Sequence, residues 1–218
     1  MIKPLTIGAV SNLYNRGIME FSMQIDDLRD YLDILEEYRE VQRIDAEVDW
    51  NLEMGAITRR VYDLGAPAVL FENVKGYPKG FRALGAPLGT SKRPGHGLFA
   101  RTALAMHMSP ISSAKDIMST YLKRKEKPIP PVLIKTGPCK ENIDLGDAVD
   151  VLKFPIPLIH GGDGGRYIGT WHTVITKDPD SSWVNWGMYR LMVHDRNTLA
   201  AYSRCSSTSV RCIKNMRR

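Results

Sequence analysis

The chain has 218 residues, of which 43% are hydrophobic and 25% are charged, a composition typical of a soluble globular protein with one large or two small domains. Its net charge of +6 does not indicate a nucleic-acid surface, because residues 201–218 carry five basic residues and no acid, which leaves the other 200 residues at only +1. Three cysteines without a CxxC spacing argue against a disulfide framework or a structural zinc site and favour a reducing compartment, and no apolar run approaches the length of a membrane span.

The N-terminal residues are predicted to precede the folded part of the chain. Residues 1–22 are predicted to be a disordered extension. Because Lys3 and Arg16 are accompanied there by a single acid, Glu20, a mitochondrial presequence is the alternative to a cytoplasmic location.

Residues 23–127 are predicted to form an α/β domain. Apolar residues three or four apart predict a helix over residues 26–42, with Asp26 or Asp27 as its cap. Asn51 is predicted to cap a second helix, which stops at Gly65. The remaining predicted elements are strands at residues 43–48, 68–74 and 81–84 and helices at residues 98–108 and 113–125.

A loop rich in Gly and Pro covers residues 85–97 and includes two basic residues, Lys92 and Arg93. It fits neither the P-loop spacing nor the dinucleotide-binding spacing, so a phosphate-binding role is not supported. Arg93 and His96 are predicted to orient the loop or to contact a neighbouring chain.

A domain boundary is predicted at residues 123–131, where a run of charged residues is followed by three prolines. Beyond it, residues 128–200 are predicted to be rich in strands, with Cys139 as a packing residue. This gives an α+β chain with an α/β layer followed by the opening of a β-barrel.

The stretch from residue 161 to residue 195 is predicted to form a hairpin. Two segments rich in β-branched and aromatic residues, 167–176 and 183–193, flank an Asp-Pro-Asp-Ser turn. Side chains alternate along a strand, so Asn185 and Arg190, five apart, would face opposite sides. They can serve one site only if the strand bulges or breaks between them, which Gly187 would permit. The pattern alone leaves open whether Asn185 is structural or binds a metal or ligand.

Several motifs resemble the N-terminal half of the UbiD-like decarboxylases, which use prenylated FMN to remove carboxylate from aromatic and α,β-unsaturated acids. The motifs are FPIPLIHGGDGGRYIGT, DPDSSWVNWGMYR and VHDRNTL, with weaker matches at DLRDYLDIL, EVDWNLEMGAITRRVY, PAVLFENVKGYP and GPCKENIDLG. The resemblance covers residues 24–200. It implies an N-terminal α/β domain followed by the first part of a split β-barrel of the flavin-reductase type, incomplete in this chain.

The resemblance also implies roles for residues of the hairpin. Asn185 is expected to be a ligand of the divalent metal, usually Mn²⁺, that joins the protein to the cofactor phosphate. Thr170 is expected to contact the cofactor, and Arg190 to belong to a catalytic Arg–Glu–Glu network. Backbone groups of residues 185–190 are expected to hold the phosphate and the isoalloxazine, with the Trp186 carbonyl facing a monovalent cation, K⁺. This run comprises Asn185, Trp186, Gly187, Met188, Tyr189 and Arg190.

Predictions can also be made for the histidines and for the partners of the protein. His160, His172 and His194 are predicted to be structural rather than metal ligands, because His172 and His194 lie within predicted strands. The resemblance implies a small aromatic or unsaturated carboxylic acid as substrate, a flavin prenyltransferase as the supplier of the cofactor, and a homo-oligomer. A membrane or nucleic-acid partner is not expected.

The resemblance ends after Leu199, where residues 201–218 form an atypical basic tail. No His follows His194 and no Asp or Glu follows Asp195, so the later metal ligands, the proton-donating Glu and the oligomer-forming domain of the family are expected to be missing. This chain is therefore expected to have little or no turnover. The alternative is a non-catalytic fragment that acts as a binding or interaction module, either regulating a full-length partner or binding RNA through its tail.

Overall fold

The computed structural model describes residues 24–201, so the predictions for residues 1–22 and for the basic tail beyond Ala201 lie outside the described residues. The chain divides into two compact units. Of the described residues, unit 1 contains 24–47, 56–73 and 82–135, and unit 2 contains 48–55, 74–81 and 136–201. Within residues 24–201, no helix has the length and apolar character needed to cross a membrane.

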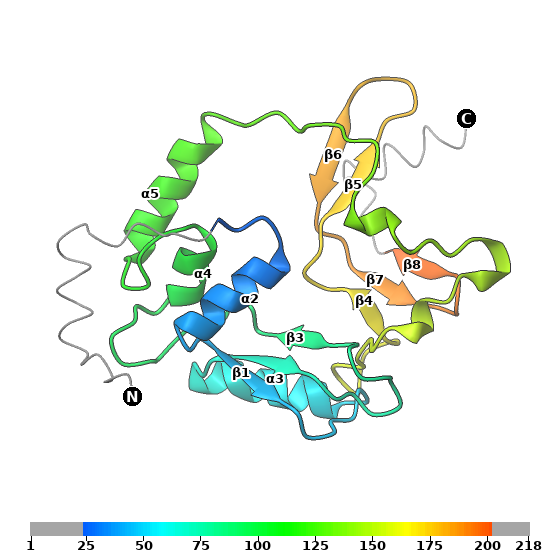
Figure 1. Ribbon diagram of the computed structural model, residues 1–218, viewed down its shortest axis with the longest axis horizontal. Coiled ribbons are helices and arrows are strands. Elements are labelled where there is room, and N and C mark those ends of the chain that lie inside the picture. The colour runs from blue at the N-terminus through cyan, green and yellow to red at the C-terminus, as the bar shows by residue number, and fades with distance from the viewer. Residues whose placement is uncertain (1–23, 202–218) are drawn as a thin grey trace. The chain divides into compact units, whose positions relative to one another are not determined.

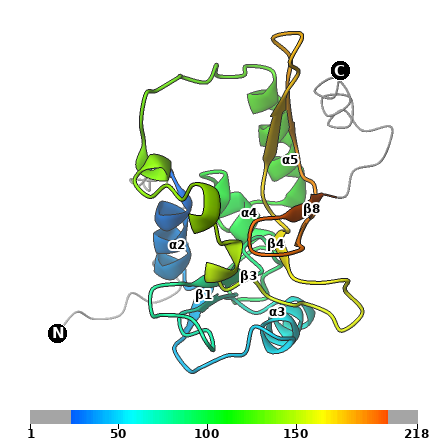
Figure 2. The same cartoon turned by 90° about the vertical axis from the view of Figure 1, so that its right-hand side faces the viewer.

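Unit 1 is built on a three-stranded sheet in the order β1–β2–β3, in which β1 is parallel to β2 and β3 is antiparallel to it. Figures 1 and 2 show α2 and α4 on one side of this sheet and α3 on the other. The elements are α2 (Leu28–Glu37), β1 (Val41–Ile44), α3 (Glu53–Leu64, in this unit from residue 56), β2 (Ala68–Phe71), β3 (Ala83–Gly85), α4 (Ala100–Ala105) and α5 (Ala114–Lys125).

Helix α2 begins as predicted and ends earlier than predicted. The Asp27 carboxylate accepts the backbone N–H groups of Arg29 and Asp30, and the Asp30 carboxylate accepts the N–H of Asp27, which forms a capping box. At the other end the Arg39 N–H donates to the Glu36 carbonyl and the Glu40 N–H donates to the Leu35 carbonyl. Arg39 has a φ of 55°, so the helix closes in a Schellman motif that turns the chain into β1 before residue 42.

The start of helix α3 also differs from the prediction. Asn51 does not directly precede the helix, which begins at Glu53, because Asn51 forms a parallel bridge with Leu158 and Leu52 adopts a φ of 69°. Gly65 ends the helix as predicted, with a φ of 60° and its N–H donated to the Tyr62 carbonyl.

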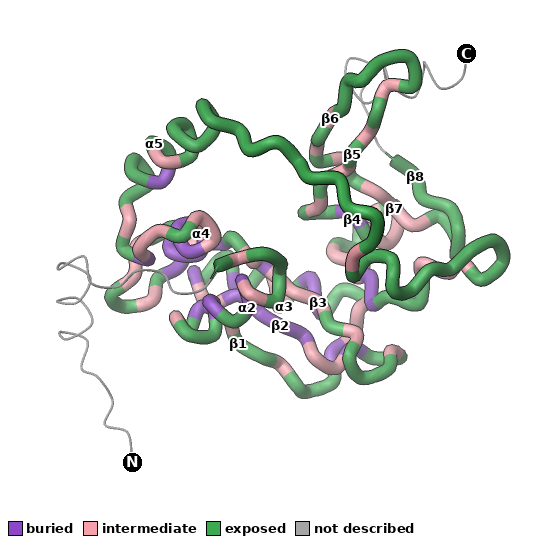
Figure 3. The backbone as a smooth tube through the Cα atoms, turned by 45° about the horizontal axis from the view of Figure 1, so that its top comes forward, coloured by how far each residue is buried: buried purple, intermediate pink, exposed green. Residues whose placement is uncertain are grey.

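The core of unit 1 lies between α2, α4 and the central strand β2. All four residues of β2 are buried, so both faces of the sheet are covered. Ile34, Leu35 and Leu104 are at most 1% exposed and pack with Tyr31 and Ala68 in one cluster. Figure 3 shows these buried segments in purple.

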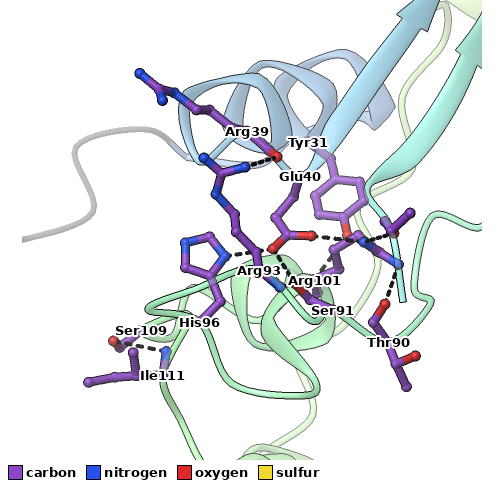
Figure 4. A network of polar contacts seen from close by, with 11 residues as sticks. Tyr31, Arg39, Glu40, Thr90, Ser91, Arg93, His96, Arg101, Ser109 and Ile111 are labelled. Atoms are coloured by element: carbon purple, nitrogen blue, oxygen red, sulfur yellow. Dashed lines mark hydrogen bonds and ion pairs between the residues drawn. The ribbon is translucent and has the colours of Figure 1, made fainter. Parts of the chain in front are cut away.

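A buried ion pair lies beside this core. Glu40 and Arg101 are both fully buried, and Arg101 Nη1 lies 2.8 Å from Glu40 Oε2. The second carboxylate oxygen of Glu40 accepts from the Ser91 hydroxyl and lies 2.6 Å from His96 Nδ1 (Figure 4). Burial acts to raise the pKa of Glu40, but the hydrogen bonds from His96 and Ser91 and the charge of Arg101 outweigh it, so this pKa lies below its ordinary value.

The same ion pair holds the loop rich in Gly and Pro. Arg101 donates from Nη2 to the Thr90 carbonyl, and Arg93 donates from Nη1 to the Arg39 carbonyl. With His96 bound to Glu40, the prediction that Arg93 and His96 orient this loop is confirmed.

The chain between α5 and the hairpin has fewer strands than predicted. Residues 126–166 contain no strand, only the short 3₁₀ helices η1 (Pro138–Lys140), η2 (Gly146–Ala148) and η3 (Val151–Lys153). The prolines in this segment cannot donate to a ladder, and apolar residues such as Ile129 and Leu133 are 92% and 99% exposed. The predicted strand-rich pattern is therefore wrong for this segment.

The strands of unit 2 belong to two small sheets. They are β4 (Tyr167–Gly169), β5 (Val174–Lys177), β6 (Val184–Gly187), β7 (Leu191–Val193) and β8 (Leu199–Ala201). One sheet has the order β4–β7–β8 and the other is the ribbon β5–β6, all antiparallel. The described residues thus form a mixed α and β fold of small sheets without a closed barrel.

The buried ion pair leads to a test of unit 1. Replacing Glu40→Gln leaves Arg101 buried without a countercharge, so the free energy of unfolding should fall by about 3–5 kcal/mol at neutral pH. Because folding lowers the pKa of Glu40, its contribution is present above the ordinary value of 4.5 and is lost as the pH falls below it. The free energies of unfolding of variant and wild type should therefore become more similar in acid. They can be measured by urea unfolding, with circular dichroism as the signal.

The matched control is Asp63→Asn, which breaks the exposed Arg59–Asp63 pair on α3. It should change the free energy of unfolding by no more than about 0.5 kcal/mol. Equal losses in the two variants would contradict the assignment of Glu40 as the countercharge of the core.

Candidate functional site

The tip of the predicted hairpin is closed by its own polar groups. The Asp178 N–H donates to the Trp183 carbonyl at 2.9 Å, and the Asp178 carboxylate accepts the Asp180 N–H at 3.1 Å. The Ser181 hydroxyl accepts the Trp183 N–H at 3.2 Å. The predicted turn is confirmed, and it fixes the register of the strands on either side.

Each of the two predicted strands is divided into two short ones. Near the tip β5 pairs with β6, so that Thr176 lies opposite Asn185 and Val174 opposite Gly187. Near the base β4 pairs with β7, with Gly169 opposite Leu191. Between these ladders, residues 170–173 of one strand lie opposite residues 188–190 of the other, and we call these two segments the hairpin break (Figures 1 and 2).

One face of the β5–β6 ribbon is polar and half-buried. Thr176 and Asn185 are directly opposite in the ladder, so their side chains share this face. The Thr176 hydroxyl is buried and has no hydrogen-bond partner among the described residues. The other face carries Ile175 and Trp186, which are 56% and 65% exposed.

The ladder ends where a side chain folds over Gly187. A Cβ on Gly187 would lie 2.6 Å from Cε2 and 2.8 Å from the hydroxyl of Tyr189, so the Tyr189 ring occupies the space that a side chain at position 187 would need. The Tyr189 hydroxyl accepts a hydrogen bond of 3.2 Å from Asn185 Nδ2. The predicted break between Asn185 and Arg190 is thus present, and Gly187 leaves room there for the Tyr189 ring.

The other candidate residues lie in the hairpin break. Thr170, Met188 and Arg190 are exposed there, and Arg190 makes no hydrogen bond or ion pair with any residue of the described chain. The register therefore places Thr170 and Arg190 on opposite strands of the same break, beside the polar face that carries Asn185. Which of these side chains touch a ligand stays a prediction.

The environment of His172 was not predicted from the sequence. His172 was predicted to lie within a strand, but it lies in the hairpin break. Its ring packs against Gly169 so closely that a Cβ on Gly169 would be 2.2 Å from His172 Cε1. Both ring nitrogens are buried without a hydrogen-bond partner among residues 24–201. His194 likewise lies just after β7 rather than within it. No sequence pattern marks His172, because its environment depends on the break.

The base of the hairpin is anchored by Arg166, a role that was not predicted from the sequence. Its guanidinium lies 4.0 Å from the centre of the Trp50 ring, and it donates to the Ile156 carbonyl at 2.6 Å and to the Tyr77 hydroxyl. Its own carbonyl accepts the Val193 N–H at 2.8 Å. One residue therefore ties both strands at the base of the hairpin to the rest of unit 2.

The acidic residue nearest the base of the hairpin has a local role. Backbone and side-chain hydrogen bonds from Asn197 and Thr198 hold the pKa of Asp195 below its ordinary value. Asp195 is exposed and its backbone N–H donates to the Thr198 carbonyl, so it closes the turn between β7 and β8. An exposed carboxyl with a lowered pKa is a poor proton donor at neutral pH.

The donors present fit a hard metal ion only in part. The described chain contains no group of three or more His, Cys, Asp or Glu residues that could hold a metal. The Asn185 carboxamide oxygen is a hard donor, and the Thr176 hydroxyl on the same face has no hydrogen-bond partner within the described part of the chain. Asn185 thus fits as one ligand of such an ion, and the other ligands would have to come from elsewhere.

Comparisons with known proteins give a consistent family. Two sequence profiles match the chain: the N-terminal domain of 3-octaprenyl-4-hydroxybenzoate carboxy-lyase over residues 32–121, and the Rift-related domain of the same family over residues 131–217. A pyrrole-2-carboxylic acid decarboxylase of Pseudomonas aeruginosa is 41% identical over 189 residues, which cover 85% of this chain and 36% of that protein. The chain spans about a third of the length of the curated relatives it matches.

Solved structures resemble the fold over most of this chain. The vanillic acid decarboxylase of Sedimentibacter hydroxybenzoicus in its closed form matches with a TM-score of 0.76 and 29% identity, over 88% of this chain and 40% of that one. An evolved dimeric form of the UbiD-class enzyme HmfF from Pelotomaculum thermopropionicum, in complex with prFMN, matches with a TM-score of 0.69 and 28% identity, over 87% and 41%.

The anchoring role of Arg166 can be tested by stability. Arg166→Met keeps much of the side-chain volume but removes the charge and its hydrogen bonds, so the free energy of unfolding of unit 2 should fall by about 1.5–3 kcal/mol. Arg190→Met, at an exposed position without a protein partner in the described chain, should change it by less than about 0.5 kcal/mol. The Val193 amide should exchange its hydrogen faster in Arg166→Met than in Arg190→Met. Equal protection of this amide in both variants would refute the anchoring role of Arg166.

Proposed function

Because the chain belongs to the UbiD family of carboxy-lyases, we propose that it forms the cofactor-binding part of a non-oxidative decarboxylase of aromatic or α,β-unsaturated carboxylic acids. The cofactor we propose is prenylated FMN, held with Mn²⁺ and K⁺. The observation that carries the proposal is the arrangement of the hairpin, in which the half-buried amide of Asn185 lies beside a break that holds Thr170 and Arg190.

Each candidate residue has a role that its chemistry supports. The Asn185 carboxamide oxygen would bind the divalent ion at the cofactor phosphate. Residues 186–189 and Thr170 would contact the cofactor through groups that lie at the end of the β5–β6 ladder or in the break. When bound, prenylated FMN supplies an electron sink for the charge that remains as CO₂ leaves.

Arg190 is proposed to hold and orient carboxylates. Its planar guanidinium can donate two parallel hydrogen bonds to a carboxylate, and no residue of the described chain occupies it. Its exposure in the hairpin break leaves it accessible to the substrate and to an acidic partner. The hairpin strands contain no Glu, so the proton that replaces CO₂ would have to come from a carboxyl elsewhere in the protein.

The identities of the relatives guide the choice of substrates and partners. Pyrrole-2-carboxylate and vanillate are the substrates named for two of the relatives, so these acids and their unsaturated analogues are the first to test. A flavin prenyltransferase is the proposed supplier of the cofactor, and a homo-oligomer the proposed assembly. A split barrel completed by further chain is the proposed architecture of the whole enzyme.

The proposal is tested by producing the chain together with a flavin prenyltransferase and measuring bound flavin and CO₂ release. Asn185→Ala should weaken flavin binding in the presence of Mn²⁺ by about 10–100-fold, because the loss of a ligand or its support has effects of that size. Asn197→Ala, which removes a similar side chain from the exposed turn after β7, should leave flavin binding unchanged.

Two outcomes of this experiment are informative. A wild-type chain that binds neither prenylated FMN nor FMN would refute the proposal. CO₂ release is expected to be low without a carboxyl beside Arg190, and robust turnover would contradict that expectation.

The alternative function, an interaction module, is favoured by the exposed apolar face of the ribbon. Ile175 and Trp186 are more than half exposed on one face of β5–β6, and each strand of this ribbon has only one hydrogen-bonded neighbour among the described strands. Open strand edges and apolar patches are the usual features of association surfaces.

This alternative predicts association that depends on the ribbon. In size-exclusion chromatography with light scattering, the wild-type chain should associate as its concentration rises, and the double variant Ile175→Lys and Trp186→Lys should not. Lys177→Glu, a charge change at an already polar exposed position of β5, serves as the control. A wild-type chain that stays monomeric at all concentrations would remove the support for this alternative.

A further inference from the structure

The side-chain amide of Asn185 can serve a metal ion in only one of its two orientations. The carboxamide has a donor end, the NH₂ group, and an acceptor end, the oxygen, and only the oxygen can bind a cation. A rotation of the group by half a turn exchanges the two ends at little cost unless a neighbour distinguishes them. A ligand role for Asn185 therefore requires a residue that fixes the orientation of its amide.

The Tyr189 hydroxyl contacts the donor end of this amide. Asn185 Nδ2 lies 3.2 Å from the Tyr189 hydroxyl and donates to it. The donor end is thereby engaged by a residue four positions further along the chain, beyond the end of β6 at Gly187. The oxygen at the other end of the amide stays available as an acceptor on the half-buried face that Asn185 shares with Thr176.

The Tyr189 ring is itself held by the local backbone. It packs on Gly187, where even a single added carbon would come within 2.6 Å of the ring. Residues 188–190 belong to neither ladder. The alternation of side chains along a strand therefore does not determine the direction of the Tyr189 side chain. Tyr189 is half-buried.

We propose that Tyr189 is a positioning residue that orients the Asn185 amide with its oxygen toward the metal at the cofactor phosphate. This inference rests on the proposed function and adds to it a side-chain role for Tyr189. It assigns Gly187 a role as well, since the missing side chain makes room for the ring.

The opposite hydrogen bond would have the opposite consequence. If the Tyr189 hydroxyl donated to the Asn185 oxygen, Tyr189 would compete with the metal for that oxygen, and its removal would strengthen metal binding. With the hydroxyl as acceptor from Nδ2, its removal leaves the amide free to rotate and weakens metal binding. The sign of the change therefore distinguishes the two arrangements.

The first arm of the test needs neither metal nor cofactor. In the full chain labelled with ¹⁵N-asparagine, the side-chain NH₂ signal of Asn185 is identified by its loss in Asn185→Ala. In Tyr189→Phe this signal should move toward that of the exposed Asn197, with faster exchange of its protons with water. Gly187→Ala should change the Asn185 signal in the same way, because the added Cβ displaces the Tyr189 ring from Asn185.

Tyr167→Phe is the matched control for this arm, since it removes a tyrosine hydroxyl from β4 in the same unit. It should leave the Asn185 signal unchanged. The inference is overturned if Tyr189→Phe also leaves that signal unchanged, whatever the result for cofactor binding.

The second arm measures Mn²⁺ binding in the presence of FMN by electron paramagnetic resonance. Tyr189→Phe should weaken Mn²⁺ binding by about 10-fold, the lower end of the effect of losing a residue that orients a metal ligand. Unchanged or tighter binding in Tyr189→Phe would overturn the proposed orientation. If the wild-type chain binds no Mn²⁺ with FMN, the proposed function fails, while the first arm still decides whether Tyr189 orients Asn185.

Discussion

The alternation of side chains along a strand is the constraint on which the candidate site depends. Asn185 and Arg190 are an odd number of residues apart, so an unbroken strand would send them to opposite faces. The hairpin instead stops pairing after Gly187 and resumes at Leu191. Four residues of one strand, 170–173, lie opposite three of the other, 188–190, so the pleat cannot pass through in register. The irregularity gives the hairpin two short ladders with a cluster of candidate binding residues between them.

The parts of the structure that local chemistry decides could be predicted from the sequence. The Asp27 cap, the end of α3 at Gly65 and the turn after Asp178 each depend on neighbouring residues whose preferences are strong. The need for a break between Asn185 and Arg190, if both serve one site, followed from their odd separation along the strand alone. Helix α2 was predicted too long because the left-handed Arg39 gives no signal where glycine is the usual residue.

Features that depend on distant contacts could not be predicted in this way. Arg166 reads as an ordinary basic residue until Trp50 and Tyr77 are brought beside it from more than 80 positions earlier in the chain. Glu40 follows a helix and resembles any surface acid, yet Arg101 and Ser91 enclose it completely. The prediction of strands failed between residues 128 and 166, because the prolines of this segment cannot donate hydrogen bonds to a ladder. The roles of Asn185, Thr170 and Arg190 at the site remain predictions, since they were drawn from family resemblance.

The packing of Tyr189 on Gly187 also limits how this hairpin can change during evolution. A larger residue at position 187 requires the ring of residue 189 to leave its present position, because both would fill the same space. Loss of the ring in turn removes the hydrogen-bond partner of Asn185 Nδ2, so a further change near the amide would be needed to restore its orientation. Substitutions at these three positions are therefore expected to be epistatic, and lineages that accept a side chain at 187 should carry a small residue at 189.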